Sequence, residues 1–133
     1  MGILSRIFGK KSIESLKEFE EELNKFREKN DSEMLALIGT GGRLKGLALV
    51  HSSKDEDLMK KYAARVNELM DPLNLVTQGK KVEELSLKFD GNHLIFKPIT
   101  EDISFFAITQ EESDISSIVE WIEDKRSDLE NLL

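Results

Sequence analysis

The chain has 133 residues, of which 39% are hydrophobic and 34% are charged, and its formal net charge at pH 7 is −7. This length fits one domain with its own core, and the acidic balance disfavours nucleic-acid binding, which needs clustered positive charge. The absence of cysteine excludes disulfides, thiolate catalysis and cysteine-based zinc sites. No apolar run is long enough to span a membrane and no segment has a signal-peptide pattern, so we expect a cytoplasmic protein.

The first eleven residues, MGILSRIFGKK, differ in charge from the rest of the chain. They carry three basic side chains and no acidic one, and their apolar residues recur at the spacing of one helical stripe. We interpret this segment as a basic amphipathic anchor for a membrane surface or a partner protein; the alternative is a chain start without function. The residues of this predicted anchor are Ile3, Leu4, Arg6, Ile7, Phe8, Lys10 and Lys11.

A helix is expected at the start of the single domain that residues 12–133 form. Apolar residues recur every three or four positions over residues 13–28, and the opposite face is rich in Glu and Lys. This is the pattern of a helix that lies on a core. Ser12 is the expected N-cap, because its hydroxyl can accept a hydrogen bond from a free N–H of the first turn.

Two nearly continuous apolar runs, residues 34–39 and 44–51, predict strands that are covered on both faces. Gly41-Gly42 between them predicts a tight hairpin, because glycine tolerates the positive φ that such turns need. The glycine-rich stretch does not match a phosphate-binding loop: the required residues are missing, and a strand rather than a helix is expected after it.

A long helix is predicted over residues 54–70. Ser53 and Glu56 have the spacing of a capping box, and Asp71-Pro72 is expected to end the helix. The apolar stripe is wide, so the helix serves either the core alone or the core together with an oligomer interface. The residues predicted for this dimer interface are Leu58, Met59, Tyr62, Ala63, Val66 and Leu69.

Three more strands are predicted over residues 82–89, 93–98 and 103–109, followed by a last amphipathic helix from Ile115. Asp90-Gly91 indicates a tight turn between the first two of these strands. The expected order is therefore α-β-β-α-β-β-β-α. Short hairpins favour an α+β domain with a five-stranded, mainly antiparallel sheet, in which the first strand pair lies beside the other three strands and flanking helices cover one or both faces.

No group of residues predicts catalysis. His51 is expected near Asp55, but neither His51 nor His93 is accompanied by a nucleophile or a set of metal ligands at a recognisable spacing. The carboxylate clusters fall on helix faces or in first turns, where solvated charge is the ordinary role. We therefore expect no enzymatic activity, no metal and no cofactor.

The element order and four segments resemble the roadblock (dynein light chain) family over about residues 13–130. The segments are LALIGTGGRLKGLALVHSS, KDEDLMKKYAARVNELM, VEELSLKFDGNHLIFKPI and ISFFAITQ. The first hairpin differs, because family members often have Asp-Gly where this chain has Gly41-Gly42. The resemblance implies a non-enzymatic homodimer, or a heterodimer with a paralogous roadblock chain, that pairs through the central helix and an adjacent strand. It also implies a scaffold or regulator that binds a small Ras-like GTPase, in some members at a membrane.

Two other classes stay open. Acidic, dimeric secretion-type chaperones share this size and charge, but they usually place three strands before the central helix and two after it, the reverse of this chain. A small-ligand sensor domain requires a roomy apolar pocket.

Overall fold

The computed structural model describes residues 15–110 and 115–133. The predicted order of helices and strands is confirmed, with one short 3-10 helix, η1, in addition. The elements are α2 (Leu16–Asn30), β1 (Met34–Gly39), η1 (Gly42–Leu44), β2 (Ala48–Ser53), α3 (Glu56–Val76), β3 (Leu85–Phe89), β4 (Asn92–Pro98), β5 (Ile103–Gln110) and α4 (Ile115–Leu132).

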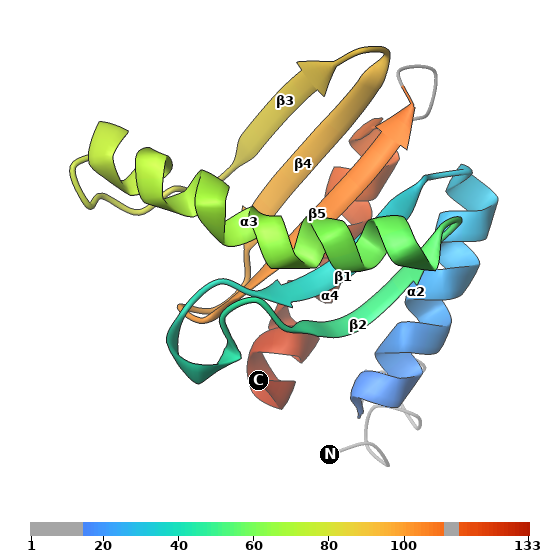
Figure 1. Cartoon of the computed structure of the whole chain (residues 1–133). Coiled ribbons are helices and arrows are strands. Elements are labelled where there is room, and N and C mark those ends of the chain that lie inside the picture. The colour runs from blue at the N-terminus through green and yellow to red at the C-terminus, as the bar shows by residue number, and fades with distance from the viewer. Residues whose placement is uncertain (1–14, 111–114) are drawn as a thin grey trace.

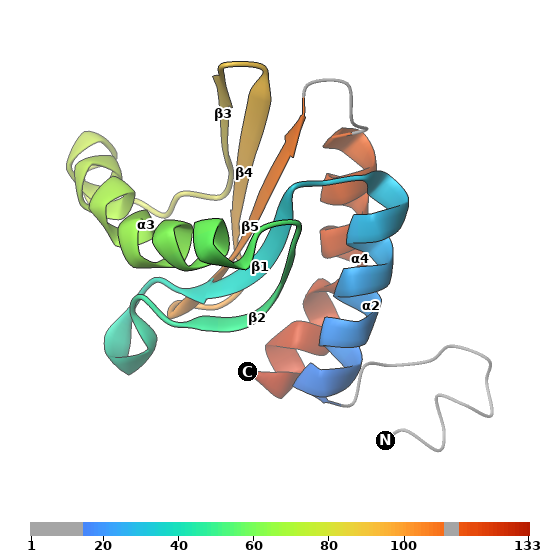
Figure 2. The same cartoon turned by 45° about the vertical axis from the view of Figure 1, so that its right-hand side comes forward.

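The five strands form one sheet in the order β2-β1-β5-β4-β3, and every neighbouring pair is antiparallel. The first strand pair lies beside the other three strands, as the sequence predicts, and the structure shows that β1 and β5 join the two sets. α2 and α4 lie side by side on one face of the sheet, and α3 crosses the other face (Figures 1 and 2). The fold is therefore a three-layer α+β domain.

The pleat of the sheet separates two hydrophobic clusters, because successive side chains of a strand point to opposite faces. Leu35 of β1 packs with Phe19 of α2 and Phe105 of β5 in the cluster beneath α2 and α4. Its neighbour Ala36 packs with Met59 in the cluster beneath α3. All six residues of β1 are buried, which is the burial expected of a strand that is covered on both faces.

Trp121 of α4 joins the two helices of one layer. Its ring stacks on Phe26 with the centroids 4.7 Å apart and on Phe19 at 5.6 Å. Such offset aromatic contacts add to the burial of apolar area.

The connection between β1 and β2 is not the tight Gly41-Gly42 hairpin that the sequence suggests. The chain forms η1 instead, and β2 begins four residues later than the predicted start at Leu44. The N–H of Gly39 donates to the carbonyl oxygen of Leu47 at 2.8 Å, which closes the base of this longer loop. A Cβ at Gly39 would lie 1.7 Å from the carbonyl oxygen of Leu44, so the loop needs glycine at this position.

Both predicted N-caps are corrected. Ser15 caps α2 by accepting from the N–H of Glu18 at 3.1 Å, and Ser12 lies outside the described residues. Asp55 caps α3, whereas Ser53 is the last residue of β2. The carboxylate of Asp55 accepts from two N–H groups of the first turn and places negative charge at the positive end of the helix dipole.

α3 does not stop before Pro72 but continues to Val76. A proline removes its own N–H from the helix, which leaves the carbonyl of Glu68 without its usual donor, and its ring crowds that carbonyl. Both residues are exposed, so water can satisfy that carbonyl. The helix ends where Gln78 and Gly79 take positive φ values of 56° and 76°.

The second hairpin follows the prediction closely. Asp90 and Gly91 have φ values of 44° and 77°, the left-handed pair that a tight hairpin turn requires. β3 is shorter than expected, beginning at Leu85 instead of residue 82.

Candidate interaction surface

The face of the sheet that carries α3 is covered only in part. β3 lies at one end of the sheet, and Leu87 and Phe89 are 42% and 38% exposed. Leu87 pairs with Leu94, which packs against the cluster beneath α3, so these exposed side chains lie on the α3 face. Apolar residues exposed along an edge strand mark a surface that a partner can cover.

The six residues predicted for the dimer interface separate into two groups. Met59, Ala63 and Val66 are 1%, 5% and 7% exposed, because they face the protein's own sheet. They offer little surface to a partner. Leu58, Tyr62 and Leu69 lie farther around the helix, where Leu58 is 40% exposed and the other two are half-buried.

An apolar hollow of about 120 Å³ lies between this flank of α3 and the sheet. Tyr62, Arg65 and Leu69 line it from the helix, and Leu94 and Ile108 are among the residues that line it from the strands. Leu94 pairs with Leu87 of β3, so the hollow lies between the exposed flank of α3 and the exposed side chains of β3.

The last turn of α3 adds residues that the sequence analysis missed, because the helix was expected to end at Pro72. This turn extends beyond the sheet (Figure 1). Leu75 and Val76 are 81% and 80% exposed, more than any other large hydrophobic side chain among the described residues. The apolar residues that directly follow the proline were the signal for this extension.

A second hollow, of about 580 Å³, lies between the C-terminal half of α3 and the β4–β5 turn. Its lining mixes polar and apolar groups: Lys80 and Lys81 line it together with Phe96, and the hydroxyls of Thr40 and Ser104 lie 3.0 Å apart. This lining differs from the apolar pocket that a small-ligand sensor requires.

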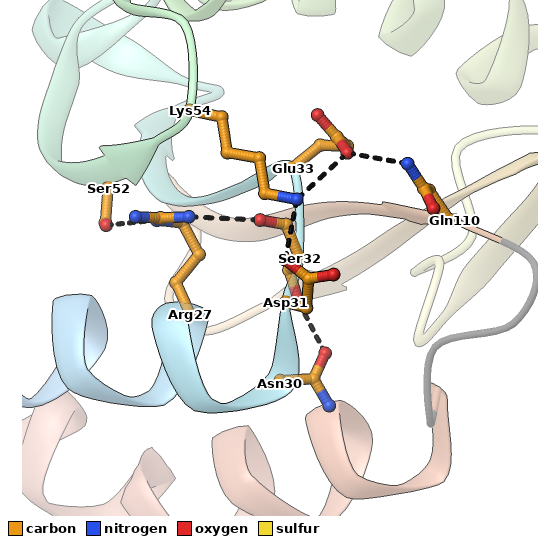
Figure 3. A network of polar contacts seen from close by, with 8 residues as sticks. All are labelled: Arg27, Asn30, Asp31, Ser32, Glu33, Ser52, Lys54 and Gln110. Carbon is orange, nitrogen blue, oxygen red and sulfur yellow. Dashed lines mark hydrogen bonds and ion pairs between the residues drawn. The ribbon is translucent and has the colours of Figure 1, made fainter.

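A polar network fixes α2 against the sheet close to the start of α3 (Figure 3). Arg27 is 9% exposed; its Nε donates to the hydroxyl of Ser52 at 2.6 Å and its Nη1 donates to the carbonyl of Ser32 at 3.2 Å. A buried guanidinium is tolerated only where its N–H groups find acceptors. The network therefore ties the end of α2 to β2.

Lys54 extends this network to the residue before the cap of α3. Its ammonium lies 2.7 Å from the carboxylate of Asp31 and 3.4 Å from that of Glu33. The hydrogen bond that Lys54 donates to Asp31, together with the charge of Lys54, lowers the pKa of Asp31, and the same hydrogen bond raises the pKa of Lys54. Gln110 of β5 donates to Glu33 at 3.1 Å, so four segments hold the point from which α3 leaves the sheet.

His51 has a different acidic neighbour from the one that the sequence predicts. The Nδ1 of His51 lies 3.7 Å from the carboxylate of Glu56, and Asp55, the predicted neighbour, caps α3 instead. Within residues 15–110 and 115–133, no group of three or more His, Asp or Glu side chains is placed to hold a metal ion. In the same part of the chain, no helix is both long and apolar enough to cross a membrane.

Comparison with solved structures identifies the fold. No protein-family model matches the chain, and no curated protein matches it in sequence. The chain has a roadblock-like fold: it superposes on the Roadblock/LC7 domain from Streptomyces avermitilis with a TM-score of 0.60 and 14% identity, covering 74% of this chain and 82% of that chain.

Three MglB structures are similar over more of the chain. Myxococcus xanthus MglB matches with a TM-score of 0.69 and 8% identity, over 86% of this chain and 93% of that chain. MglB with a tetrameric arrangement matches with a TM-score of 0.70 and 13% identity, over 86% and 87%. The gliding protein MglB from Thermus thermophilus matches with a TM-score of 0.65 and 14% identity, over 84% of each chain.

Proposed function

We propose that the protein is a non-enzymatic dimeric scaffold or regulator that binds a small Ras-like GTPase. The observation that carries the proposal is the apolar surface formed by the exposed flank of α3 and by β3, on a domain with the roadblock-like fold. The GTPase partner is inferred from the family that the sequence resembles and whose fold the chain has. The partner across the apolar surface is a second copy or a related roadblock chain.

A second copy presents the same apolar surface and can therefore cover this one. Leu87 and Phe89 would then be buried, and each Å² of apolar area removed from water would stabilise the dimer by about 25 cal/mol. Two β3 strands lying edge to edge would also satisfy each other's free backbone groups and join two sheets into one. One of the similar structures is described as MglB with a tetrameric arrangement, which supports self-association of this fold.

The order of elements argues against a secretion-type chaperone. In this chain two strands precede the long helix and three follow it, whereas the chaperones have the opposite arrangement.

Light scattering tests the dimer. We expect the wild-type protein to have twice the mass of one chain and Tyr62→Asp to have the mass of one chain, because a buried carboxylate in the interface loses its hydration. Ser127→Asp adds the same charge on the exposed side of α4 and should remain dimeric. Circular dichroism must show that both variants keep the wild-type fold. A wild-type protein that is monomeric at high micromolar concentration would overturn the dimer.

Affinity capture with the dimeric protein tests the GTPase. We expect a Ras-like GTPase to be retained from the native lysate in amounts that differ between GTP-loaded and GDP-loaded samples. Capture of no GTPase in either state contradicts the proposal. The purified protein alone should not hydrolyse GTP, and hydrolysis that His51→Ala or His93→Ala abolishes would show that it is an enzyme.

A further inference from the structure

The hollow between the C-terminal half of α3 and the β4–β5 turn has the size of a small-molecule site. Its volume of about 580 Å³ falls within the range of about 300–1,000 Å³ that such sites occupy. Part of its wall is apolar and consists of Met70, Val82, Phe96, Pro98 and Ile99. The rest of the wall is polar, so the lining suits a ligand that has an apolar body and a polar head.

Lys80 and Lys81 give the polar part of the wall a positive charge. Both side chains are exposed, and within the described part of the chain no ion pair joins either ammonium group to a carboxylate. The opposing charge in the described lining is that of Glu101, whose side chain is also exposed. The wall therefore keeps an excess of positive charge on a protein whose net charge is −7, and an anion would neutralise it.

A pair of hydroxyl groups in the same wall has a hydrogen to donate. Thr40, which follows β1, and Ser104 of β5 line the hollow with their oxygen atoms 3.0 Å apart, and Ser104 is 1% exposed. Each hydroxyl carries one hydrogen, and the bond between them uses only one of the two. Among residues 15–110 and 115–133, no further acceptor takes the second hydrogen. An anion in the hollow would accept it in a charge-assisted hydrogen bond.

A neighbouring hollow of about 380 Å³ shows what distinguishes the free lysines. Lys97 and Arg126 line it together with Lys81. However, Lys97 forms an ion pair with Glu123, and Arg126 donates to both carboxylate oxygens of Glu123 at 3.1 Å. Because these two cations already have an anionic partner within the chain, the smaller hollow has little charge left for a ligand.

We propose that the hollow of about 580 Å³ binds a phosphate monoester with an apolar body. The phosphate head lies between Lys80, Lys81 and the hydroxyl pair, and the body packs against the apolar wall. A phosphate monoester carries a charge of about −1.5 to −2 at pH 7 and three acceptor oxygens, which matches two ammonium groups and one free hydroxyl hydrogen. This chemistry occurs both in soluble metabolites and in the head group of phosphatidic acid.

The proposed dimer leaves this hollow open. Met70 and Asn74 line it from α3, whereas Tyr62 and Leu69 line the apolar hollow on the flank that the dimer covers. At 3.6 residues per turn, the two pairs lie roughly 110° apart around the helix. Ligand binding and pairing therefore use different sides of α3, and the absence of either one leaves the other unaffected.

Calorimetric titration of the full-length protein with octyl phosphate, below its micelle concentration, tests the binding. We expect saturable binding, and at least about tenfold weaker binding of inorganic phosphate and of octanol, because each has only one half of the ligand. In NMR spectra, the backbone amides of Thr40, Lys81 and Ser104 should be among those that shift most. Octyl phosphate that does not saturate, or that shifts residues elsewhere instead, would overturn the proposal.

Charge variants test the position of the head. Lys80→Gln combined with Lys81→Gln should weaken binding about tenfold or more, because charge-assisted hydrogen bonds are lost. Lys25→Gln combined with Lys29→Gln removes the same charge from the exposed side of α2 and should leave the dissociation constant within about twofold of the wild-type value. Glu101→Gln should strengthen binding, since it removes the opposing charge. Equal effects of the two lysine pairs would contradict the proposal.

A blocking variant tests the position of the body. Asn74 is exposed, so Asn74→Trp should keep the fold in circular dichroism while its ring occupies the hollow. We expect at least about tenfold weaker binding of octyl phosphate. Unchanged affinity would show that the ligand binds elsewhere.

Vesicles that contain phosphatidic acid separate the two sources of the ligand. If the wild-type protein sediments with them more than the variant with Lys80→Gln and Lys81→Gln, and the variant with Lys25→Gln and Lys29→Gln sediments like the wild type, the head group belongs to a lipid. Equal sedimentation of all three proteins, together with binding of octyl phosphate in solution, assigns a soluble ligand.

Discussion

Arg27 and Ser52 join α2 to β2 inside the protein: the guanidinium Nε donates to the serine hydroxyl at 2.6 Å. The same hydroxyl donates to the side-chain oxygen of Asn24, also at 2.6 Å. The serine is 6% exposed. It thus links a buried cation to a surface amide, and this link helps to fix the place where α3 begins.

Replacing Ser52 by alanine should destabilise the fold by about 1–3 kcal/mol, because it leaves the buried Arg27 Nε without an acceptor. Urea unfolding followed by the fluorescence of Trp121, the single tryptophan, measures the change. Lys25→Ala, on the exposed side of α2, is the control and should change the free energy of unfolding by less than about 0.5 kcal/mol. Equal stabilities of the two variants would show that the hydrogen bond contributes nothing.

Gly39→Ala should destabilise the protein by about 3 kcal/mol, because the new methyl group would lie 1.7 Å from the backbone carbonyl of Leu44 and the loop must move. Gly79→Ala separates this clash from backbone strain. Gly79 has φ +76° and nothing within 4 Å of an added Cβ, so only about 1–2 kcal/mol of left-handed strain is expected. Thermal unfolding of both variants should show the larger decrease for Gly39→Ala; the reverse order would contradict the close contact.

Glu123 makes the stability depend on acidic pH. Arg126 donates to both of its carboxylate oxygens at 3.1 Å, and Lys97 forms an ion pair with it. The hydrogen bond from Arg126, followed by that from Lys97, lowers the pKa of Glu123 from 4.5 to about 2. A pKa below the unfolded value stabilises the fold above pH 4.5, and this contribution is lost as the pH falls toward 2.

The expected loss is about 1 kcal/mol between pH 5 and pH 2.5, since the Glu123 side chain is 42% exposed and water weakens the ion pairs. Urea unfolding at the two pH values measures it. Glu123→Gln should have lower stability at pH 5 and a smaller change with pH than the wild-type protein. An unchanged pH dependence would show that other carboxylates cause the acid sensitivity.

The basic segment of residues 1–11 lies outside the described residues, and its role as a membrane or partner anchor stays a prediction. Each buried apolar side chain contributes about 1.5–3 kcal/mol and each basic residue near an anionic leaflet about 1 kcal/mol, against the cost of ordering the segment. We expect full-length protein to sediment with anionic vesicles at low salt more than a variant lacking residues 1–11, and salt to remove the difference. Equal sedimentation of the two would exclude the membrane role.

The sequence by itself determined the elements and their order, because periodicity, caps and turns depend on neighbouring residues. Asp90 and Gly91 form the predicted turn, since their local preference for positive φ agrees with the pairing of β3 and β4. The run of residues 34–39 forms a strand buried on both faces, because its continuous apolar character is satisfied only between two helical layers.

Only the tertiary structure decided which residues of α3 are available to a partner. The sequence placed Met59, Tyr62 and Val66 in one wide stripe, but the direction of the sheet buries Met59 and Val66 and leaves Tyr62 on the flank. The tertiary structure also lets the helix continue past Pro72, because the carbonyl of Glu68, which loses its donor there, is open to solvent. Burial and solvent access depend on segments far away in the chain, and a local pattern carries no information about where those segments lie.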